Sequence, residues 1–272
     1  MPRRSTVERA PTCPLCGGRR YGRLWRTADY ALWRCVTCRL TRRQLLRSQP
    51  NLYAEADYFA GYLRDREQFR AIFTDLLDTL ERERQPPGRL LDVGCGIGLL
   101  LECARERGWM ASGVEVSEWA ATEARRAGFD VRTGDVASVE IESASVDAIV
   151  INHVLEHVDD PLATLELLAS WLAPGGVLAV GAPNFGSPMA IIEREHWPAL
   201  IPLQHVWQLT PATLDGLLRR AGLIPLRRTT AMQPRNYRRH PKDWVKRALY
   251  AIATRLNAAE TMVVLARRPS PS

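Results

Sequence analysis

Apolar and polar positions follow two different periods along most of the chain. Short apolar runs bounded by turn residues predict buried strands, whereas apolar residues three or four positions apart predict the helices between them. The expected strands lie at 89–93, 111–115, 129–132, 147–151, 176–181, near 223–229 and at 261–267. The expected helices lie at 98–107, 117–127, 160–172 and 211–221. This alternation predicts an α/β fold with a doubly wound parallel sheet, which binds ligands at the carboxyl ends of its strands.

A further helical pattern precedes the first of these strands. Within residues 62–84, apolar side chains recur at helical spacing, at Phe69, Ile72, Phe73, Leu76, Leu77 and Leu80. The segment Gln85-Pro-Pro-Gly88 ends this pattern and leads into the first strand. Asp160 and Pro161 mark a helix start of the usual kind, with an N-cap carboxylate followed by proline at the first helical position.

Four of the six cysteines form two pairs near the N-terminus. The pairs are Cys13-x-x-Cys16 and Cys35-x-x-Cys38, with eighteen residues between them. This spacing is typical of four thiolates around a structural zinc ion, a site with no open coordination position. Residues 1–45 are therefore expected to form a zinc-ribbon-like module. Cys95 and Cys103 lie outside these pairs and are expected to pack as small apolar side chains.

The first strand of the sheet runs into a glycine-rich turn. The stretch RLLDVGCGIGLLLE, residues 89–102, places glycines at Gly94, Gly96 and Gly98. The dinucleotide-binding fingerprint G-x-G-x-x-G requires a glycine where this chain has Leu99, so a pyrophosphate ligand is disfavoured. Glu115 ends the second strand, where a carboxylate can accept hydrogen bonds from both hydroxyls of a ribose.

Several segments together resemble class I S-adenosylmethionine-dependent methyltransferases. They are LLDVGCGIG, GVEVS, the Gly-Asp after the third strand, NHVLEHVDDP and LAPGGVLAV, and the resemblance covers roughly residues 60–268. The cysteine module and the segment HWPALIPLQHVWQLTPATLDGLLRRAG resemble bacterial methyltransferases that carry a zinc-ribbon-like head and act on small molecules. The resemblance implies a Rossmann-like seven-stranded sheet whose last strand, 261–267, is antiparallel. It also implies S-adenosylmethionine as the cofactor.

The resemblance assigns the cofactor contacts residue by residue. Asp92, Gly94, Gly96 and Gly98 would surround its methionyl and ribose part, Glu115 would hold the ribose, Asp135 and the Val136 backbone would face adenine, and Asn152 would line the methionine end. Glycines suit this role because they let the backbone approach a ligand that has a carboxylate, an ammonium and a ribose but no phosphate.

Methyl transfer to a hydroxyl also needs a proton acceptor, and histidine titrates near neutral pH. We expect His205 to be this base, because it lies in a proline-rich loop positioned to cover an acceptor. His157 is the next candidate, followed by His153, which is four residues earlier and can share a helix face with it. The alternatives are that His153, His157 or both only cap or pack their segment, and that the tryptophans of the loop around His205 only form the core of a lid.

The composition leaves two classes of acceptor open. The net charge is +7, with an isoelectric point near 9.4, and the excess arginines are spread along the chain, as on a solvated surface. Arginines crowd the cysteine module, at Arg19, Arg20, Arg23, Arg26 and Arg34, and a second basic segment covers 232–257. An RNA methyltransferase is therefore the alternative, although the basic residues are not interleaved with aromatics as in single-stranded RNA binders. We expect methylation of a small molecule such as a sugar or secondary metabolite, at oxygen.

The remaining expectations concern organisation and location. The sequence shows no secretory signal and no apolar run of roughly 20 residues, which predicts a cytoplasmic protein without a membrane partner. The expected divisions are the module at 1–45, a linker and N-terminal helix at 46–88, and a methyltransferase domain at 89–268 with a substrate-covering insertion around 184–210 and the basic segment at 232–257. The pattern predicts no particular oligomeric state.

Overall fold

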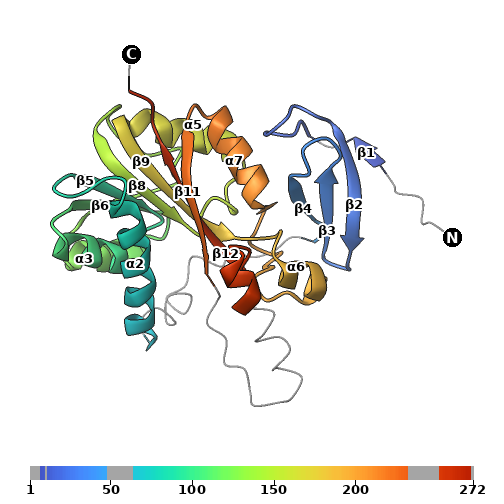
Figure 1. The fold of residues 1–272 in the computed structure, drawn as a ribbon, viewed down its shortest axis with the longest axis horizontal. Helices are drawn as coiled ribbons and strands as arrows, with labels where there is room; N and C mark the ends of the chain where they lie inside the picture. Colours follow the sequence, from blue (N-terminus) through green and yellow to red (C-terminus); the bar gives the residue numbers. More distant parts are fainter. Residues whose placement is uncertain (1–6, 10, 48–63, 232–250, 271–272) are drawn as a thin grey trace.

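The computed structural model describes residues 7–9, 11–47, 64–231 and 251–270. Its main body is a seven-stranded sheet in the order β11-β12-β9-β8-β5-β6-β7 (Figure 1). The strands are β5 (Arg89–Val93), β6 (Met110–Glu115), β7 (Asp130–Thr133), β8 (Val146–Asn152), β9 (Leu172–Pro183), β11 (Ile224–Ala231) and β12 (Thr261–Arg267). The strands from β7 to β9 pair in parallel, whereas β12 pairs antiparallel with both β9 and β11. The expected Rossmann-like sheet with an antiparallel last strand is confirmed.

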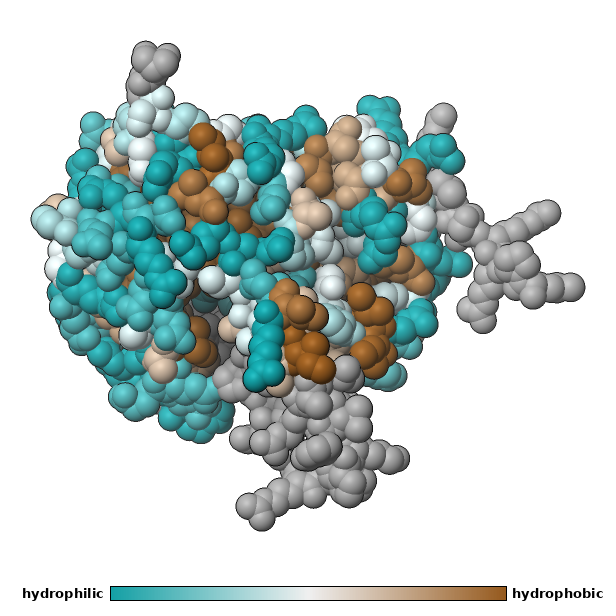
Figure 2. Space-filling model, viewed as in Figure 1, coloured by the Kyte–Doolittle hydropathy of each residue, from teal (hydrophilic) through white to brown (hydrophobic). Residues whose placement is uncertain are grey.

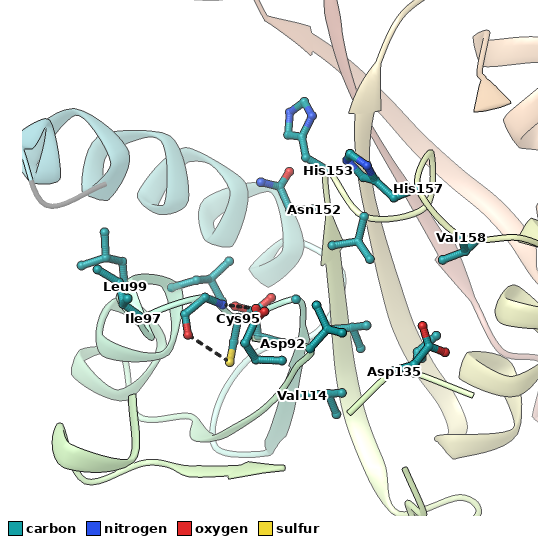
Figure 3. A pocket seen from close by; sticks show the side chains of 18 of the residues that line it. Asp92, Cys95, Ile97, Leu99, Val114, Asp135, Asn152, His153, His157 and Val158 are labelled. Carbon is teal, nitrogen blue, oxygen red and sulfur yellow. Dashed lines mark hydrogen bonds between the residues drawn. The ribbon is translucent and has the colours of Figure 1, made fainter. Parts of the chain in front are cut away.

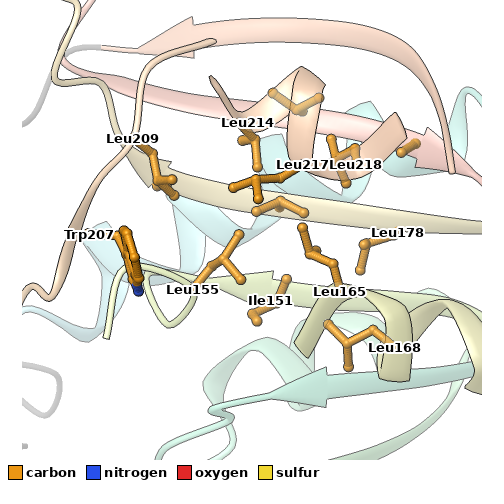
Figure 4. Packing of buried hydrophobic residues seen from close by; sticks show 14 of the residues in the cluster. Ile151, Leu155, Leu165, Leu168, Leu178, Trp207, Leu209, Leu214, Leu217 and Leu218 are labelled. Carbon is orange, nitrogen blue, oxygen red and sulfur yellow. The ribbon is translucent and has the colours of Figure 1, made fainter. Parts of the chain in front are cut away.

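Helices pack against both faces of this sheet. They are α2 (Arg66–Glu81), α3 (Leu99–Glu106), α4 (Glu118–Arg126), α5 (Pro161–Trp171) and α7 (Pro211–Arg220). Two further elements, α6 (Pro188–Glu193) and the 3-10 turn η2 (Arg194–His196), follow β9, and α6 buries Met189 in a separate cluster with Tyr30 and Leu32. On one face, α3 buries Leu100 in a cluster with Val150 of β8. On the other, α5 and α7 bury Leu165 and Leu214 in a cluster with Ile151 of the same strand (Figure 4). Successive residues of β8 therefore serve opposite helical layers, as expected of a strand buried on both faces.

The starts of α5 and α7 follow from local side-chain chemistry. The Asp160 carboxylate accepts a hydrogen bond from the backbone N–H of Leu162, and Pro161 occupies the first helical position, as predicted. Thr210 and Thr213 form a reciprocal capping box at the start of α7. An N-cap of this kind stabilises a helix by about 1 kcal/mol. These caps fix the ends of the loops that lead from β8 and β10 into the helices.

A second, five-stranded antiparallel sheet contains the N-terminal module. Its strands are β1 (Val7–Arg9), β2 (Arg20–Arg26), β3 (Tyr30–Cys35), β4 (Thr41–Leu45) and β10 (Trp207–Gln208), in that order. The last of these comes from the segment before α7, and it pairs Trp207 with Arg42. Tyr21 and Leu40 of the module belong to the same buried cluster as Leu209 and Leu214. The module is thus joined to the main body by a shared sheet and a shared core.

The division into a module, a linker and a methyltransferase domain stays a prediction. Most of the expected linker, 48–63, and of the expected basic segment, 232–250, lies outside the described residues. The expected insertion at 184–210 contains α6, η2 and β10. Because β10 extends the sheet of the module, this insertion links the two sheets.

One face of the surface carries a local group of exposed apolar side chains. In Figure 2 the brown, hydrophobic atoms gather over α6 and over the helical segment at 251–257, where Ile191, Ile192, Ile252 and Leu256 are exposed. Much of the same face is hydrophilic. Within the described ranges, no helix has the length and apolar character needed to cross a membrane.

Candidate active site

A cavity of about 330 Å³ lies at the carboxyl ends of β5, β6 and β8. The glycine-rich turn forms one wall, and Asn152, His153 and His157 extend from the end of β8 along another (Figure 3). Ligands of doubly wound sheets bind at this edge, so the cavity is where the topology alone would place a site.

The conformation of the glycine-rich turn explains its residue types. Gly94, Gly96 and Gly98 have φ angles of 80°, 54° and 88°, a region that residues with a Cβ rarely adopt. A Cβ on Gly94 would lie 2.3 Å from the Cγ2 of Val154, which is not a feasible contact. The dinucleotide-binding fingerprint would place its third glycine at Leu99. In this fold Leu99 begins α3 and is buried, so its side chain packs in the core.

Glu115 holds the glycine-rich turn in place from the neighbouring strand. Its carboxylate accepts one hydrogen bond from the N–H of Gly96 and another from the N–H of Ser117, both at 2.8 Å. Burial raises the pKa of Glu115, and these backbone hydrogen bonds oppose that rise. The end of β6 is therefore fixed to the turn that follows β5.

Asp92 lies at the base of the cavity and is 4% exposed. Burial, together with the nearby charge of Glu115, raises the pKa of Asp92 to about 8. No hydrogen bond from the described residues reaches its carboxyl group. Two buried carboxyl groups lie on one wall, and one of them has no partner in the part of the chain that the structure describes. This end of the cavity is therefore suited to a positively charged ligand.

Most of the predicted cofactor residues line this cavity. They are Asp92, Gly94, Gly96, Glu115, Asp135, Val136 and Asn152, and Gly98 is the exception because it caps α3. The Asp135 carboxylate accepts a hydrogen bond from the N–H of Ala137, which fixes the turn after β7. The structure brings these residues together, and their roles in binding stay a prediction.

The three predicted base candidates form one cluster beside the cavity. His153 and His157 line it, whereas His205 is not among the lining residues and is 4% exposed. The rings of His157 and His205 meet edge to face, with centroids 4.7 Å apart. His153 Nδ1 donates a hydrogen bond to Glu156 Oε1 over 3.2 Å.

Glu156 is the residue at this site that the sequence reasoning missed. It is 1% exposed and lies between two histidines in the segment His153-Val-Leu-Glu156-His157. A carboxylate flanked by histidines was the available signal, because a buried carboxylate needs cationic or hydrogen-bonding neighbours. Glu156 Oε2 and His205 Nδ1 are buried and have no hydrogen-bond partner among the described residues. Such an unsatisfied group costs roughly 1–3 kcal/mol.

The titratable side chains of this cluster shift one another's pKa values. Burial alone would raise the pKa of Glu156, but the hydrogen bond from His153 and the three nearby histidines bring it below its ordinary value. Burial lowers the pKa of His157, and it lowers the pKa of His205 to about 4, although Glu156 opposes both shifts.

The N-terminal module holds the His205 segment against Glu156. The N–H groups of Val206 and Trp207 donate to the backbone oxygen of Glu156, at 2.7 and 3.0 Å. On the other side of the same segment, the N–H of Arg43 in β4 donates to the oxygen of Val206 at 2.8 Å. The Arg43 guanidinium also donates to the His205 oxygen, at 3.4 Å. The position of His205 thus depends on hydrogen bonds to both the module and the loop that follows β8.

The four cysteines of the module form a compact cluster. Their sulfur atoms all lie within 4.8 Å of one another, and the members are Cys13, Cys16, Cys35 and Cys38. In each pair a turn closes on the first cysteine, because Gly17 N–H donates to Cys13 oxygen and Arg39 N–H donates to Cys35 oxygen. Gly17 and Arg39 both have φ near 70° (71° and 67°), so the two turns share a conformation. Four thiols in this arrangement suit a tetrahedral zinc ion.

Comparisons with known proteins agree with this geometry. The family model described as a methyltransferase domain matches residues 62–226, more than half of the chain. A ubiquinone biosynthesis O-methyltransferase of Xanthomonas axonopodis pv. citri is 33% identical over 161 residues, which cover 54% of this chain and 67% of that protein. For several other relatives of the same name the chain spans less than two thirds of their length, for example 60% for the one from Dinoroseobacter shibae.

Solved structures show the same fold. The complex between the Haloferax volcanii Trm112 methyltransferase activator and a methyltransferase gives a TM-score of 0.63 at 19% identity, covering 82% of this chain and 100% of that one. The 1,6-didemethyltoxoflavin-N1-methyltransferase of Burkholderia thailandensis, solved with S-adenosylhomocysteine, gives 0.56 at 18% identity, covering 91% and 99%. At these identities the likeness concerns the fold alone.

Proposed function

The chain belongs to the methyltransferase-domain family of S-adenosylmethionine-dependent enzymes, and from that premise we propose that it methylates a hydroxyl group of a small molecule. The relatives named as O-methyltransferases support the oxygen acceptor. The observation that carries the proposal is the cavity at the sheet edge, with its glycine turn in the positive-φ conformation and its buried Asp92 and Glu115.

The residues of the cavity fit S-adenosylmethionine. Asp92 is a buried carboxyl group without a partner among the described residues, and such a group favours a ligand with positive charge. When bound, the cofactor supplies a methyl carbon attached to a positively charged sulfur. Gly94 and Gly96 would let the backbone approach it, and Glu115, Asp135, Val136 and Asn152 would contact its other parts, with Gly98 holding the turn onto α3.

The chain's own contribution to the reaction is mainly position and charge. The turn at 94–98 and the ends of β5, β6 and β8 would hold the reacting carbon in line with an acceptor oxygen on the histidine side of the cavity. His153 lines the cavity with its side chain 37% exposed, so it can pass a proton to water. We assign the proton-accepting role to the cluster of His153, His157 and His205, in which Glu156 supplies negative charge.

The cysteine module is proposed to hold a structural zinc ion. The donor set and the two matching turns support a closed four-thiolate site at Cys13, Cys16, Cys35 and Cys38. The metal would stabilise the sheet to which β10 belongs. In this proposal zinc affects the active site through the position of the His205 segment and takes no part in the chemistry.

The reaction can be tested with S-adenosylmethionine labelled with tritium in its methyl group. The purified full-length protein would be incubated with a panel of small aromatic and sugar hydroxyl compounds and, separately, with total RNA. We expect label in a small product that extracts into organic solvent or elutes as a small molecule, and none with Gly94→Ala. Label recovered in RNA would overturn the small-molecule proposal and establish the alternative, with a steep salt dependence of binding as its companion result.

A further inference from the structure

Three side chains beside the cavity have the composition of a metal site. Glu156, His157 and His205 each offer one ligand atom, and these atoms lie within 4.8 Å of one another. Two of the three carry an unsatisfied atom, since Glu156 Oε2 and His205 Nδ1 are buried and have no hydrogen-bond partner among the described residues. Both side chains are more than nine-tenths buried. Buried polar atoms of native proteins are almost always satisfied, so the cluster lacks a component.

The chemistry of the donors indicates what that component is. Among the described residues, no second hydrogen-bonding side chain reaches these two atoms. Two imidazoles and one carboxylate form a donor set that suits divalent first-row transition metals, and such sets commonly leave coordination positions open. Ligand atoms around one such ion lie roughly 3–4 Å apart, given bonds of about 2.1 Å, so small side-chain rotations would bring the three together.

We propose that Glu156, His157 and His205 bind a divalent transition-metal ion whose open positions face the acceptor end of the cavity. The location follows from His157, which both belongs to the cluster and lines the cavity. His153 lies on the cavity side of the cluster, where it donates to the other oxygen of Glu156. This hydrogen bond orients the carboxylate so that Oε2 is left for the ion, as outer-sphere hydrogen bonds do for metal ligands.

The ion would act on the acceptor oxygen, and this part of the inference rests on the proposed methyl transfer. With His157 and His205 as ligands of the ion, His153 is the member of the histidine cluster left to pass on the proton. Coordination makes a hydroxyl more acidic, so its O–H bond breaks and the proton leaves through His153 to water. The oxygen then forms a bond to the methyl carbon while the sulfur–carbon bond breaks, and the electron pair of that bond stays on sulfur. The products are the methyl ether and a neutral thioether, with no oxidant or reductant required.

The arrangement gives the two metal sites different characters. The cysteine cluster is a four-ligand site that leaves no position for a substrate. The Glu156–His157–His205 cluster has three protein ligands, one of which is a hard oxygen donor. It should therefore accept Mn²⁺, which binds thiolates poorly, and this difference separates the two sites in an experiment.

The test is Mn²⁺ binding to the full-length protein with its cysteine site loaded with zinc. Loss of the free-Mn²⁺ electron paramagnetic resonance signal would count bound ions, and mass spectrometry would count zinc after gel filtration. We expect one additional ion per chain, as Mn²⁺ or as a second Zn²⁺, in the wild-type protein. Glu156→Gln and His205→Ala should each weaken its binding at least 10-fold. Glu195→Gln, which alters an exposed carboxylate on η2, should bind as the wild type does.

The outcomes separate this inference from the proposed function. Zinc content of one ion per chain and an unchanged melting temperature in Glu156→Gln would show that the variant is folded. If the wild-type protein binds neither Mn²⁺ nor a second Zn²⁺, or if Glu156→Gln binds them equally well, the metal site is wrong, even when S-adenosylmethionine still binds. If the ion binds as expected but no hydroxyl compound is methylated, the metal site stands and the proposed function fails.

Discussion

The two ends of the cavity are built in different ways. At the cofactor end, Asp92, Gly94 and Glu115 lie on or directly after neighbouring parallel strands, so the sheet itself brings them together. At the histidine end, Glu156 and His157 follow β8, but His205 comes from the segment before β10. That segment is held by hydrogen bonds from Arg43 of the N-terminal module.

This difference predicts how each end of the cavity responds to amino-acid substitutions. The cofactor end depends on strand pairing and on backbone conformation within β5, β6 and the turns after them. The histidine end depends in addition on a module whose stability we attribute to a metal ion. Binding of the cofactor and transfer of the methyl group should therefore be separable by mutation.

The largest effect is expected at the cofactor end, for Gly94→Ala. The new Cβ would lie 2.3 Å from Val154 Cγ2, and φ at this position is 80°. Overpacking and left-handed strain together cost about 3 kcal/mol or more, so cofactor affinity and methyl transfer should fall at least 100-fold. Calorimetric titration with S-adenosylmethionine measures the first quantity.

The matched control for this variant is Gly22→Ala. A Cβ on Gly22, in β2, would meet no atom within 4 Å, so the variant should bind the cofactor like the wild type. If Gly94→Ala also bound normally, the glycine turn would not be the cofactor site.

The next effect should be confined to the histidine end, for Cys35→Ser. Loss of one thiolate should release zinc and loosen β10, so methyl transfer should fall at least 10-fold. Cofactor affinity should change less than about 3-fold, which is about 0.6 kcal/mol. Zinc content, cofactor titration and initial rates on the same preparation check all three points.

Cys103→Ala is the control, because Cys103 is a buried packing residue on α3 outside the cysteine cluster. It should keep its zinc. Parallel loss of cofactor affinity and activity in Cys35→Ser would contradict the independence of the two ends.

A smaller effect concerns protons at the cofactor end. With its pKa raised to about 8, the carboxyl of Asp92 is mostly protonated at pH 7 when the cavity holds no cation. A cationic ligand favours the ionised form, so cofactor binding should release roughly one proton. Calorimetry at pH 7 in two buffers of different ionisation enthalpy measures this number, and Asp92→Asn should bring it near zero.

The same pKa predicts a pH dependence of stability. A raised folded-state pKa means that the contribution of Asp92 to stability is fully present below its unfolded pKa of about 3.9 and is lost as the pH rises through about 8. Relative to the wild type without cofactor, Asp92→Asn should therefore gain melting temperature between pH 4 and 8. No relative gain over that range would show that Asp92 is not buried as described.

The smallest effect is expected for Arg43→Ala at the histidine end. The variant loses the 3.4 Å contact from the guanidinium to His205 oxygen but keeps the backbone hydrogen bond to Val206. Methyl transfer should fall by roughly 2- to 5-fold, which corresponds to about 0.5–1 kcal/mol for one hydrogen bond. Arg47→Ala, at an exposed arginine near Asp29, is the control. Equal rates for the two variants would argue against the module as a support for His205.

The cofactor end was largely predictable from the sequence because its features are local. The glycine turn follows its strand directly, and Glu115 ends the next strand. The hydrophobic period and the turn residues were therefore sufficient to predict where these residues lie in the fold. The cysteine cluster was predictable for the same reason, since each pair lies within one turn.

The histidine end was not predictable in the same way. The position of His205 depends on β10, a two-residue strand that pairs with β4 across most of the chain. The hydrophobic period of the segment does not predict this pairing, because the register between distant strands is set by tertiary contacts. Glu156 was also not predicted, since its position in the cluster depends on its burial and on His205, which lies far from it in sequence.

The most direct test of the account is the equilibrium binding of S-adenosylmethionine to Glu115→Gln and to His205→Ala. Glu115 accepts hydrogen bonds from Gly96 and Ser117 and is assigned to the ribose, so its substitution should weaken binding at least 10-fold. His205 lies outside the lining of the cavity, so His205→Ala should bind within about 2-fold of the wild type while losing methyl transfer. Unchanged binding by Glu115→Gln, or equal losses in the two variants, would contradict the assignment of the two ends.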